Sequence, residues 1–573
     1  MRMVLSGNGA VPGFAVGRVY VHSKDFIVPS ENYIPAGEEQ SHLDRYLLIK
    51  KEALSELENI QKSVEKENPQ KAMIFEAHRE IVDDVIINDE IPAKILNDRW
   101  AGDWAIYQVY ETVLAVLRQT ADPLIAERAI DFDDVRANLL RLWYGRKSDE
   151  LSDLKEPVII AASELMPSDT ANINREKVLA IVTEKGGILS HTAIIAKSYG
   201  IPTVLGVQGL LENIKHGQFA AVNADEGKVF PDPEDEILAE YIKKSDVFKH
   251  KRAETETWLK KEARTACGEK IDIGLNIANT DTDISVEKHS DFVGLFRTEF
   301  LYMGRETLPS EDEQFSVYRK VLECYGKRPV VLRTLDIGGD KKLSCLKLPQ
   351  EENPFLGNRA LRLCFSFPDI FKTQIRAALR ASLYGNLWLM FPMVTSIEDI
   401  RRANEFVNIS KDELKKKNLS FGEIKTGIMI EVPSIALIAG LAAEEVDFAS
   451  IGSNDLCQYL CAADRMNCTV ESYYQSYHPA MFSLINDVVS AFIKAGKSIS
   501  ICGEMGSDEK ALPALIGLGL RKFSMGYGSV AAVKKTIAGV TVKECEEIAR
   551  QVLKLPDASE IKKVLAQYAR SAS

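Results

Sequence analysis

The sequence predicts a multidomain α/β protein that ends in a (β/α)8 barrel, and three observations support this fold class. At 573 residues the chain is too long for one hydrophobic core, and its length indicates three or four domains. A segment of helical periodicity interrupts a region of strand signals in the first half. From Lys270 to the end, short apolar strands alternate with amphipathic helices, which is typical of a parallel barrel.

The predicted organisation has four parts. They are an α/β domain made of residues 1–30 and 147–232, an inserted helical domain at 31–146, a helical linker at 233–265 and the (β/α)8 barrel at 266–573.

The insertion follows from the order of the signals along the chain. Strand patterns occur at Val11–Val21 and return at Pro157–Ala162, so the two segments are expected to share one sheet. Between Glu38 and Tyr144 the pattern is helical, with little Gly or Pro, and predicts three or four antiparallel helices. The linker is highly charged with scattered apolar residues, which predicts a long exposed helix.

Composition narrows the class of protein further. Apolar residues make up 46% of the chain and charged residues 27%, as in ordinary soluble proteins. No apolar stretch is long enough to span a bilayer, and the first residues lack a secretory signal, so we expect a cytoplasmic protein without membrane contact. The net charge of −12 argues against nucleic-acid binding and fits a partner with a basic face. All nine cysteines lie from Cys267 onward, which predicts reduced thiols.

The most informative segment of the first half surrounds His191. A glycine pair breaks the strand Val178–Val182, and either Ser190 or Thr192 can cap a short helix that Gly200 ends. The imidazole then lies at a helix N-terminus, where the helix dipole favours its neutral, nucleophilic form and stabilises an incoming anion. A histidine that takes up a phosphoryl group needs both effects, although a histidine that only caps a Gly-rich turn gives the same local pattern.

Polar residues recur where the predicted barrel strands end. They are Arg297 and Glu299, Arg333 and Asp336, Glu431, Asn454 and Asp455, and Cys502 and Glu504, with Arg359 and Arg362 in a nearby loop. Because functional residues of such barrels follow the carboxyl ends of the strands, we expect these side chains to converge on one mouth.

The residue types at this mouth define a chemistry. Guanidinium groups bind phosphate and carboxylate groups through paired hydrogen bonds. The carboxylates of Glu431 and Asp455 can hold one Mg²⁺ ion, and the thiol of Cys502 can give or accept a proton. The substrate that this set predicts is a small phosphorylated carboxylic acid.

Over essentially its whole length, the sequence resembles Enzyme I of the phosphoenolpyruvate-dependent sugar phosphotransferase system. The matching segments, in order, are 186–192, 294–305, 332–341, 353–359, 452–459 with 463–465, and 502–504. Together they are highly specific for that family.

The resemblance implies a role for each site residue. It implies that His191 is the phosphorylated residue and that Cys502 gives a proton to the enolate. It implies that phosphoenolpyruvate is bound by Arg297, Arg333, Arg359, Asn454 and Arg465. The implied ligands of Mg²⁺ are Glu431 and Asp455. It also implies that the helical insertion docks the carrier protein HPr, through Ala77–Asp84 and Glu127–Asp131, and that the barrel forms a homodimer. The implied activity is transfer of the phosphoryl group to His191 and then to a histidine of HPr, with release of pyruvate.

The sequence departs from the family pattern at a few positions. Leu189, Ser453 and Cys457 stand where the family usually has Thr, and Asn223 stands where Asp is expected, whereas Thr170 fits the polar neighbour of the histidine. These departures keep open a catalytically weak regulatory or scaffolding homologue. A dikinase or synthase with a similar histidine would need a large nucleotide-binding domain, and the sequence has no Gly-x-x-x-x-Gly-Lys-Ser/Thr loop.

Overall fold

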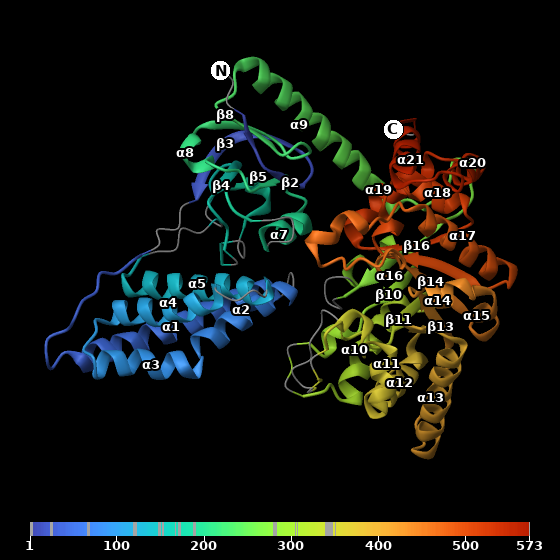
Figure 1. Cartoon of the computed structure of the whole chain (residues 1–573), viewed down its shortest axis with the longest axis horizontal. Coiled ribbons are helices and arrows are strands. Elements are labelled where there is room, and N and C mark those ends of the chain that lie inside the picture. The colour runs from blue at the N-terminus through green and yellow to red at the C-terminus, as the bar shows by residue number, and fades with distance from the viewer. Residues whose placement is uncertain are drawn as a thin grey trace. The chain divides into compact units, whose positions relative to one another are not determined.

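The chain folds into two compact units, Met1–Arg252 and Ala253–Ser573, in a computed structural model (Figure 1). The structure describes residues 4–22, 27–65, 69–118, 123–146, 151, 154–166, 168–169, 173–186, 191–278, 284–303, 305, 307–338, 346, 348–349 and 351–571. The predicted fold class is confirmed, because the first unit joins an α/β sheet to a helical bundle and the second is a closed (β/α)8 barrel. The boundaries of the four-part division stay a prediction.

The first unit contains an eight-stranded mixed sheet in the order β1-β8-β7-β3-β4-β5-β6-β2. Its strands are β1 (Leu5–Ser6), β2 (Asn8–Val11), β3 (Phe14–His22), β4 (Val158–Ala162), β5 (Val178–Thr183), β6 (Thr203–Leu205), β7 (Phe219–Asn223) and β8 (Lys228–Pro231). As predicted, strands from the two separated segments share this sheet: β3 pairs in parallel with β4, with Arg18 opposite Val158. The whole bundle is therefore inserted between two neighbouring strands.

The bundle contains five helices in the part of the chain that the structure describes (Figure 1). They are α1 (Glu39–Glu65), α2 (Pro69–Val82), α3 (Val85–Leu96), α4 (Gly102–Arg118) and α5 (Pro123–Trp143). The prediction of three or four helices is wrong, because Asp84 separates α2 from α3. Its Oδ1 accepts hydrogen bonds from the backbone N–H groups of Ile86 (3.0 Å) and Ile87 (3.2 Å), which caps the start of α3. The bundle has its own core around Tyr46, Phe75, Ile91, Tyr110 and Leu139.

Between β4 and Glu256 the described residues form three α-helices: α7 (His191–Tyr199), α8 (Leu210–Asn213) and α9 (Asp235–Glu256), the last of which runs across the boundary between the two units. The predicted linker helix corresponds to α9, which a 3₁₀ turn at Thr257–Lys260 follows. The buried side chain of Asn223 connects the sheet to α9, because its amide donates to the hydroxyl of Tyr241 at 3.4 Å. Its Oδ1 accepts from the backbone N–H of Glu226, so this amide serves as both donor and acceptor, which a carboxylate cannot do.

The second unit is built on a closed barrel of eight parallel strands. These are β9 (Asp272–Ile277), β10 (Phe292–Phe296), β11 (Pro329–Arg333), β12 (Asn386–Phe391), β13 (Lys425–Ile430), β14 (Phe448–Gly452), β15 (Ser498–Cys502) and β16 (Lys522–Met525). Pairing of β16 with β9, with Lys522 opposite Asp272, closes the barrel. A compact group of side chains, which includes Trp388, Met429, Phe448 and Cys502, packs separately from the large outer core.

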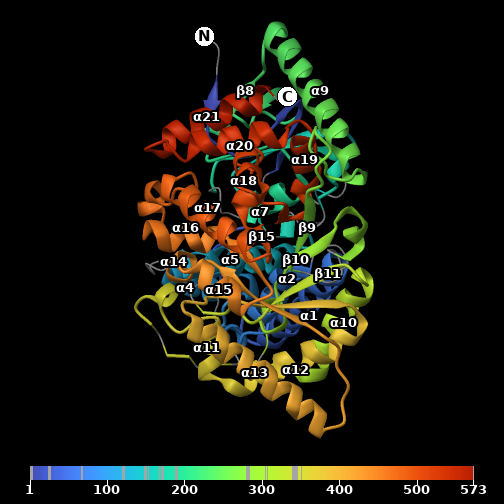
Figure 2. The same ribbon diagram turned by 90° about the vertical axis from the view of Figure 1, so that its right-hand side faces the viewer.

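Helices cover the outside of the barrel (Figures 1 and 2). They are α10 (Glu311–Tyr325), α11 (Leu361–Ser366), α12 (Pro368–Ala381), α13 (Ile397–Lys416), α14 (Pro433–Leu437), α15 (Ala439–Glu445), α16 (Ser453–Cys461), α17 (Pro479–Lys494), α18 (Leu512–Gly517), α19 (Tyr527–Ala538), α20 (Val542–Val552) and α21 (Ala558–Ser571). Of all the helices in the described ranges, none combines the length and apolar character that crossing a membrane requires.

Candidate active site

An ion-pair network links the predicted site residues at the carboxyl ends of the barrel strands. Arg333 is the last residue of β11 and is almost fully buried. One guanidinium nitrogen donates to Glu299, which follows β10, and another lies 2.9 Å from Oδ2 of Asp336. The same guanidinium group also contacts the sulfur of Met429 at 3.8 Å. Arg333 is thus held in one position before any substrate arrives.

Asp336 extends this network to Arg359. Its second oxygen accepts from Nη2 of Arg359 at 2.9 Å, so one buried carboxylate holds two arginines. Nη1 of Arg359 donates to the hydroxyl of Tyr459 at 3.1 Å and lies 3.6 Å from Oδ1 of Asp455. Burial alone would lower the pKa of both guanidinium groups, but Asp336 and the other carboxylates raise it, so both stay charged.

Two further carboxylates adjoin the arginines. Oε1 of Glu431, directly after β13, accepts from the backbone N–H of Met393 at 2.6 Å. Oε2 of Glu431 and Oδ1 of Asp455 are buried and have no hydrogen-bond partner among the described residues. The pKa of Glu431 is raised to about 8, chiefly by burial and also by the charge of Asp455, against the lowering effect of Arg333 and Arg359.

This donor set fits a divalent cation. Two adjacent carboxylates with oxygen lone pairs that accept no hydrogen bond are suitable ligands for a hard cation such as Mg²⁺, which takes its remaining ligands from water and substrate. Within the described ranges, no group of three or more His, Cys, Asp or Glu side chains is placed to hold a metal ion. The pair Glu431 and Asp455 would therefore need ligands from the substrate or solvent.

The thiol of Cys502 lies at the end of β15 and is buried. The hydroxyl of Ser450 donates to its sulfur at 3.2 Å, and the thiol faces the carbonyl of Ile451 at 3.6 Å. Burial raises the pKa of Cys502, and the lowering effects of Ser450 and Arg333 do not reverse this. Cys502 therefore keeps its proton near neutral pH, as a proton donor requires.

If Cys502 has the role that the resemblance to Enzyme I implies, replacing it with Ala lowers the rate of pyruvate release about 100-fold, which is the usual contribution of one general acid. Phosphoenolpyruvate binding should change little, because the guanidinium groups stay in place. Rapid-quench measurement of pyruvate in a single turnover, alongside binding measured by calorimetry, checks both expectations. A variant with the native rate of pyruvate release would assign the proton transfer to another group.

The other predicted ligands surround the same network. Arg297 follows β10, its side chain is exposed, and its charge lowers the pKa of Cys502. Asn454 begins α16 with Ser453, and its Oδ1 accepts from the backbone N–H of Glu504 at 3.1 Å. Arg465 lies 3.7 Å from Oδ1 of Asp455. The structure therefore brings these residues together, whereas the exposed Arg362 donates to the backbone carbonyls of Leu356 and Gly357 instead.

Some functional contacts were missed by the sequence reasoning. The strand-end pattern includes Asp336 but does not show that it bridges two arginines, although the Arg-x-x-Asp spacing from Arg333 was a usable signal. Met393 gave no signal, since its contribution is a backbone N–H. Met393 has a positive φ of 54°, which is a sparsely populated conformation for a non-glycine residue. In this conformation its backbone N–H donates to Glu431.

His191 lies in the first unit, as the first residue of α7. Gly200, with φ of 62°, follows the helix, as predicted. Thr192 does not act as the cap, because its hydroxyl donates to the carbonyl of Leu165. The predicted neighbours Thr170, Leu189 and Ser190 lie outside the described residues.

Hydrogen bonds join the bundle to the α/β part of the first unit at Ser168, two residues before Thr170 in the sequence. Asp134 of α5 accepts from both the backbone N–H (3.1 Å) and the hydroxyl (2.7 Å) of Ser168. The neighbouring Asp169 lies 3.3 Å from the ring of His22 in β3. In the bundle, the buried ring of His78 lies 3.1 Å from Asp131. His78 therefore connects α2 to α5 and is not part of the exposed surface.

Comparison with known proteins agrees with this geometry. Residues 6–128 match the N-terminal domain of the PEP-utilising enzymes, residues 154–227 match their mobile domain, and residues 252–542 match their PEP-binding domain. Among curated relatives, the phosphoenolpyruvate-protein phosphotransferase of Priestia megaterium is 39% identical over 98% of both chains. Those of Bacillus subtilis (40%, over 97% of this chain and 98% of that one) and Staphylococcus carnosus (37%, over 100% of both) are similarly close.

The fold and the site define a PEP-utilising enzyme, with the histidine on one unit and the arginine network on the other. The sequence identity between this chain and each of these relatives extends over nearly the whole length of both proteins. This confirms the resemblance to Enzyme I that the sequence motifs indicated. The chain belongs to the phosphoenolpyruvate-protein phosphotransferase family.

Proposed function

We propose that this enzyme transfers the phosphoryl group of phosphoenolpyruvate to its own His191 and then to a histidine of HPr, releasing pyruvate as the first step of the sugar phosphotransferase system. The observation that carries the proposal is the buried network in which Glu299 and Asp336 hold Arg333 and Arg359 at the barrel mouth. Such fixed positive charges suit the transfer of a phosphoryl group, where catalysis is mostly positioning and charge stabilisation.

The residues divide the chemistry as follows. Arg297, Arg333, Arg359, Asn454 and Arg465 bind the phosphate and carboxylate groups of phosphoenolpyruvate. A ring nitrogen of His191 attacks phosphorus in line with the bond to the enol oxygen, which breaks as the new N–P bond forms. The enolate of pyruvate then takes the proton of the Cys502 thiol at its methylene carbon, and the thiolate regains a proton from solvent.

The proposed metal is Mg²⁺, held by Glu431 and Asp455. When bound, the ion neutralises charge on the phosphoryl and carboxylate oxygens of the substrate. The assignment is supported by Oε2 of Glu431 and Oδ1 of Asp455, which are buried and accept no hydrogen bond from the described residues.

The bundle is the proposed docking site for HPr. The expected segment Ala77–Asp84 leads directly into Val85 and Ile86, whose side chains are 72% and 67% exposed. An exposed apolar pair of this kind is typical of an interaction surface. The net charge of −12 on the whole chain suits a basic face on the carrier.

The barrel is the proposed site of homodimer formation. Leu437 in α14 and Tyr473, which follows α16, expose 77% and 68% of their side chains. Burial of such residues against a second copy would remove apolar surface from water.

The test is transfer of ³²P from labelled phosphoenolpyruvate to the purified protein and onward to HPr. With Mg²⁺ we expect an acid-labile, base-stable label that moves to HPr while pyruvate appears, and with excess EDTA we expect at least a 100-fold slower uptake. If the protein binds phosphoenolpyruvate but takes up no ³²P, the result would instead favour the alternative that the chain is a catalytically weak regulatory or scaffolding homologue. Label that stays on the protein after HPr is added would overturn the proposed acceptor alone.

A further inference from the structure

The barrel has a cavity at the end opposite the arginine network. It has a volume of about 320 Å³, and several of its residues begin barrel strands: Asp272, Phe292, Pro329, Phe448, Ser498 and Lys522. The proposed substrate and metal ligands of the barrel lie instead at or after the carboxyl ends of the strands, and none of them lines this cavity. Its volume lies at the small end of the range for ligand pockets, which is about 300–1,000 Å³.

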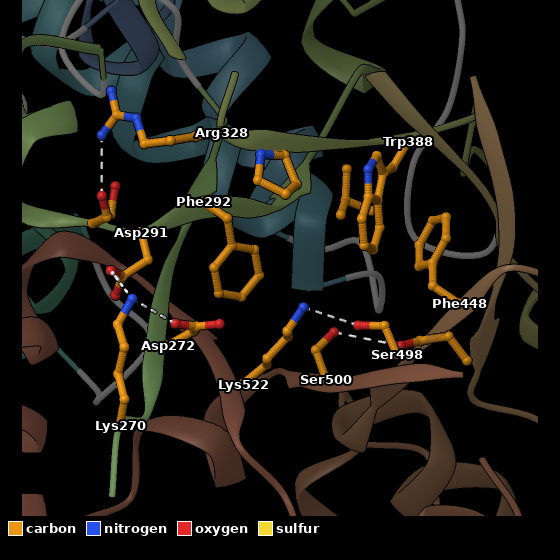
Figure 3. Close-up of a pocket in the computed structure, with 14 residues that line it drawn as sticks. Lys270, Asp272, Asp291, Phe292, Arg328, Trp388, Phe448, Ser498, Ser500 and Lys522 are labelled. Atoms are coloured by element: carbon orange, nitrogen blue, oxygen red, sulfur yellow. Dashed lines mark hydrogen bonds and ion pairs between the residues drawn. The ribbon is translucent and has the colours of Figure 1, made fainter. Parts of the chain in front are cut away.

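Aromatic rings form the apolar part of this amino-end cavity (Figure 3). Trp388 and Phe448 pack together with their ring centroids 4.8 Å apart, and Phe292 lies apart from them. Glycines on neighbouring strands make room for two of the rings. A Cβ atom at Gly274 would lie 2.7 Å from the Phe292 ring, and one at Gly427 would lie 2.6 Å from the Phe448 ring.

The ammonium group of Lys522 lies between these rings (Figure 3), 6.0 Å from the centroid of Phe292 and 5.4 Å from that of Trp388. It donates to the hydroxyl of Ser498 at 3.0 Å. Among the residues that the structure describes, no carboxylate lies within ion-pair distance of it. Burial lowers the pKa of Lys522, and the charges of Lys425 and Lys270 lower it further against the raising effect of Asp272.

The other charged groups of the cavity already have partners. Lys270 lies 3.1 Å from Asp272 and 3.3 Å from Asp291, so both carboxylates pair with this one ammonium group, and Asp272 acts on Lys522 only at longer range. Arg328 is likewise paired with Glu287 at 2.7 Å. The cavity ammonium with no carboxylate at ion-pair distance, among the described residues, is therefore Lys522 at the aromatic end. The ammonium of Lys425 also lies there, 4.6 Å from the Trp388 centroid.

We propose that the amino-end cavity binds a small aromatic carboxylate, with the ring packed against Trp388 and Phe292 and the carboxylate paired with Lys522. Both halves of this ligand follow from the lining. Flat apolar walls favour a planar ring. A half-buried ammonium with no direct ion pair among the described residues favours an anion that accepts a charge-assisted hydrogen bond. The cavity has room for a ligand of one or two fused rings. This inference goes beyond the proposed phosphoryl transfer and uses none of its residues.

The test is isothermal titration calorimetry of the full-length protein with indole-3-carboxylate as the probe. We expect saturable binding to the native protein. Indole-3-carboxamide, which has the same shape without the charge, should bind at least about tenfold more weakly, because the ion pair with Lys522 is lost.

Two variants locate the site. Lys522→Met keeps the length of the side chain but removes its charge, and it should lower carboxylate affinity about tenfold while leaving carboxamide binding unchanged. Lys554→Met, at an exposed position away from the cavity, should change neither affinity. Circular dichroism confirms that each variant is folded. Equal affinities of the native protein for the two probes, or no saturation by either, would overturn the proposal without any variant, and undiminished carboxylate binding by Lys522→Met would overturn the assigned contact.

Discussion

Replacing His191 with Ala is expected to reduce phosphoryl uptake from phosphoenolpyruvate by at least about 10⁴-fold, the scale of effect seen when a catalytic nucleophile is removed. Binding of phosphoenolpyruvate should persist, because the proposed binding residues belong to the second unit and His191 to the first. Uptake of ³²P and calorimetric binding measured on the same preparation separate the two steps.

His216→Ala is the matched control for this prediction. His216 is an exposed histidine in the same unit, where its ring packs beside Tyr20. This variant should take up label at the native rate. If His191→Ala still becomes labelled at an acid-labile position, the phosphorylated residue is a different histidine, and the role proposed for the first residue of α7 is wrong.

Replacing Arg333 with Met should have two effects. Loss of a preorganised charge at the phosphoryl group is expected to lower the rate of phosphoryl uptake at least about 10³-fold. The free energy of unfolding of the barrel unit should also fall, by about 3–5 kcal/mol, because Glu299 and Asp336 each lose a buried ion pair with Arg333.

Arg297→Met provides the contrast. Its side chain is exposed, so removing its charge should change the free energy of unfolding by less than about 0.5 kcal/mol while still slowing phosphoryl uptake. Urea denaturation followed by circular dichroism measures the first quantity, and rapid-quench labelling measures the second. Equal stability losses in the two variants would show that the buried network does not hold Arg333 as described.

Much of this molecule could be predicted from local patterns. Strand-end positions such as Arg333, Glu431 and Cys502 are readable because an apolar run followed directly by a functional side chain has a fixed place in a βα barrel. The parallel pairing of β3 with β4 followed from strand signals on both sides of a helical segment. In each case the information lies within a few consecutive residues.

The rest depends on contacts between distant residues. The link from Asp336 to Arg359, and the N–H group that Met393 offers to Glu431, exist only once neighbouring strands are in register. The fifth bundle helix was missed because Asp84 interrupts a helical pattern that is apolar on both sides. The amino-end cavity combines the starts of strands far apart in the chain, and sequence gives no measure of the space left between Trp388 and Phe292.

The insertion of the bundle between β3 and β4 has a consequence for how the protein assembles during synthesis. β3 leaves the ribosome long before its parallel partner exists, so its edge stays unpaired while α1 to α5 are made. Because the bundle has a core of its own, it can fold first and bring the ends of the two strands together, which shortens the loop that sheet formation must close. The order of folding would then run from the bundle to the sheet, and the helix that begins with His191 would form only after the part of the chain proposed to dock its acceptor.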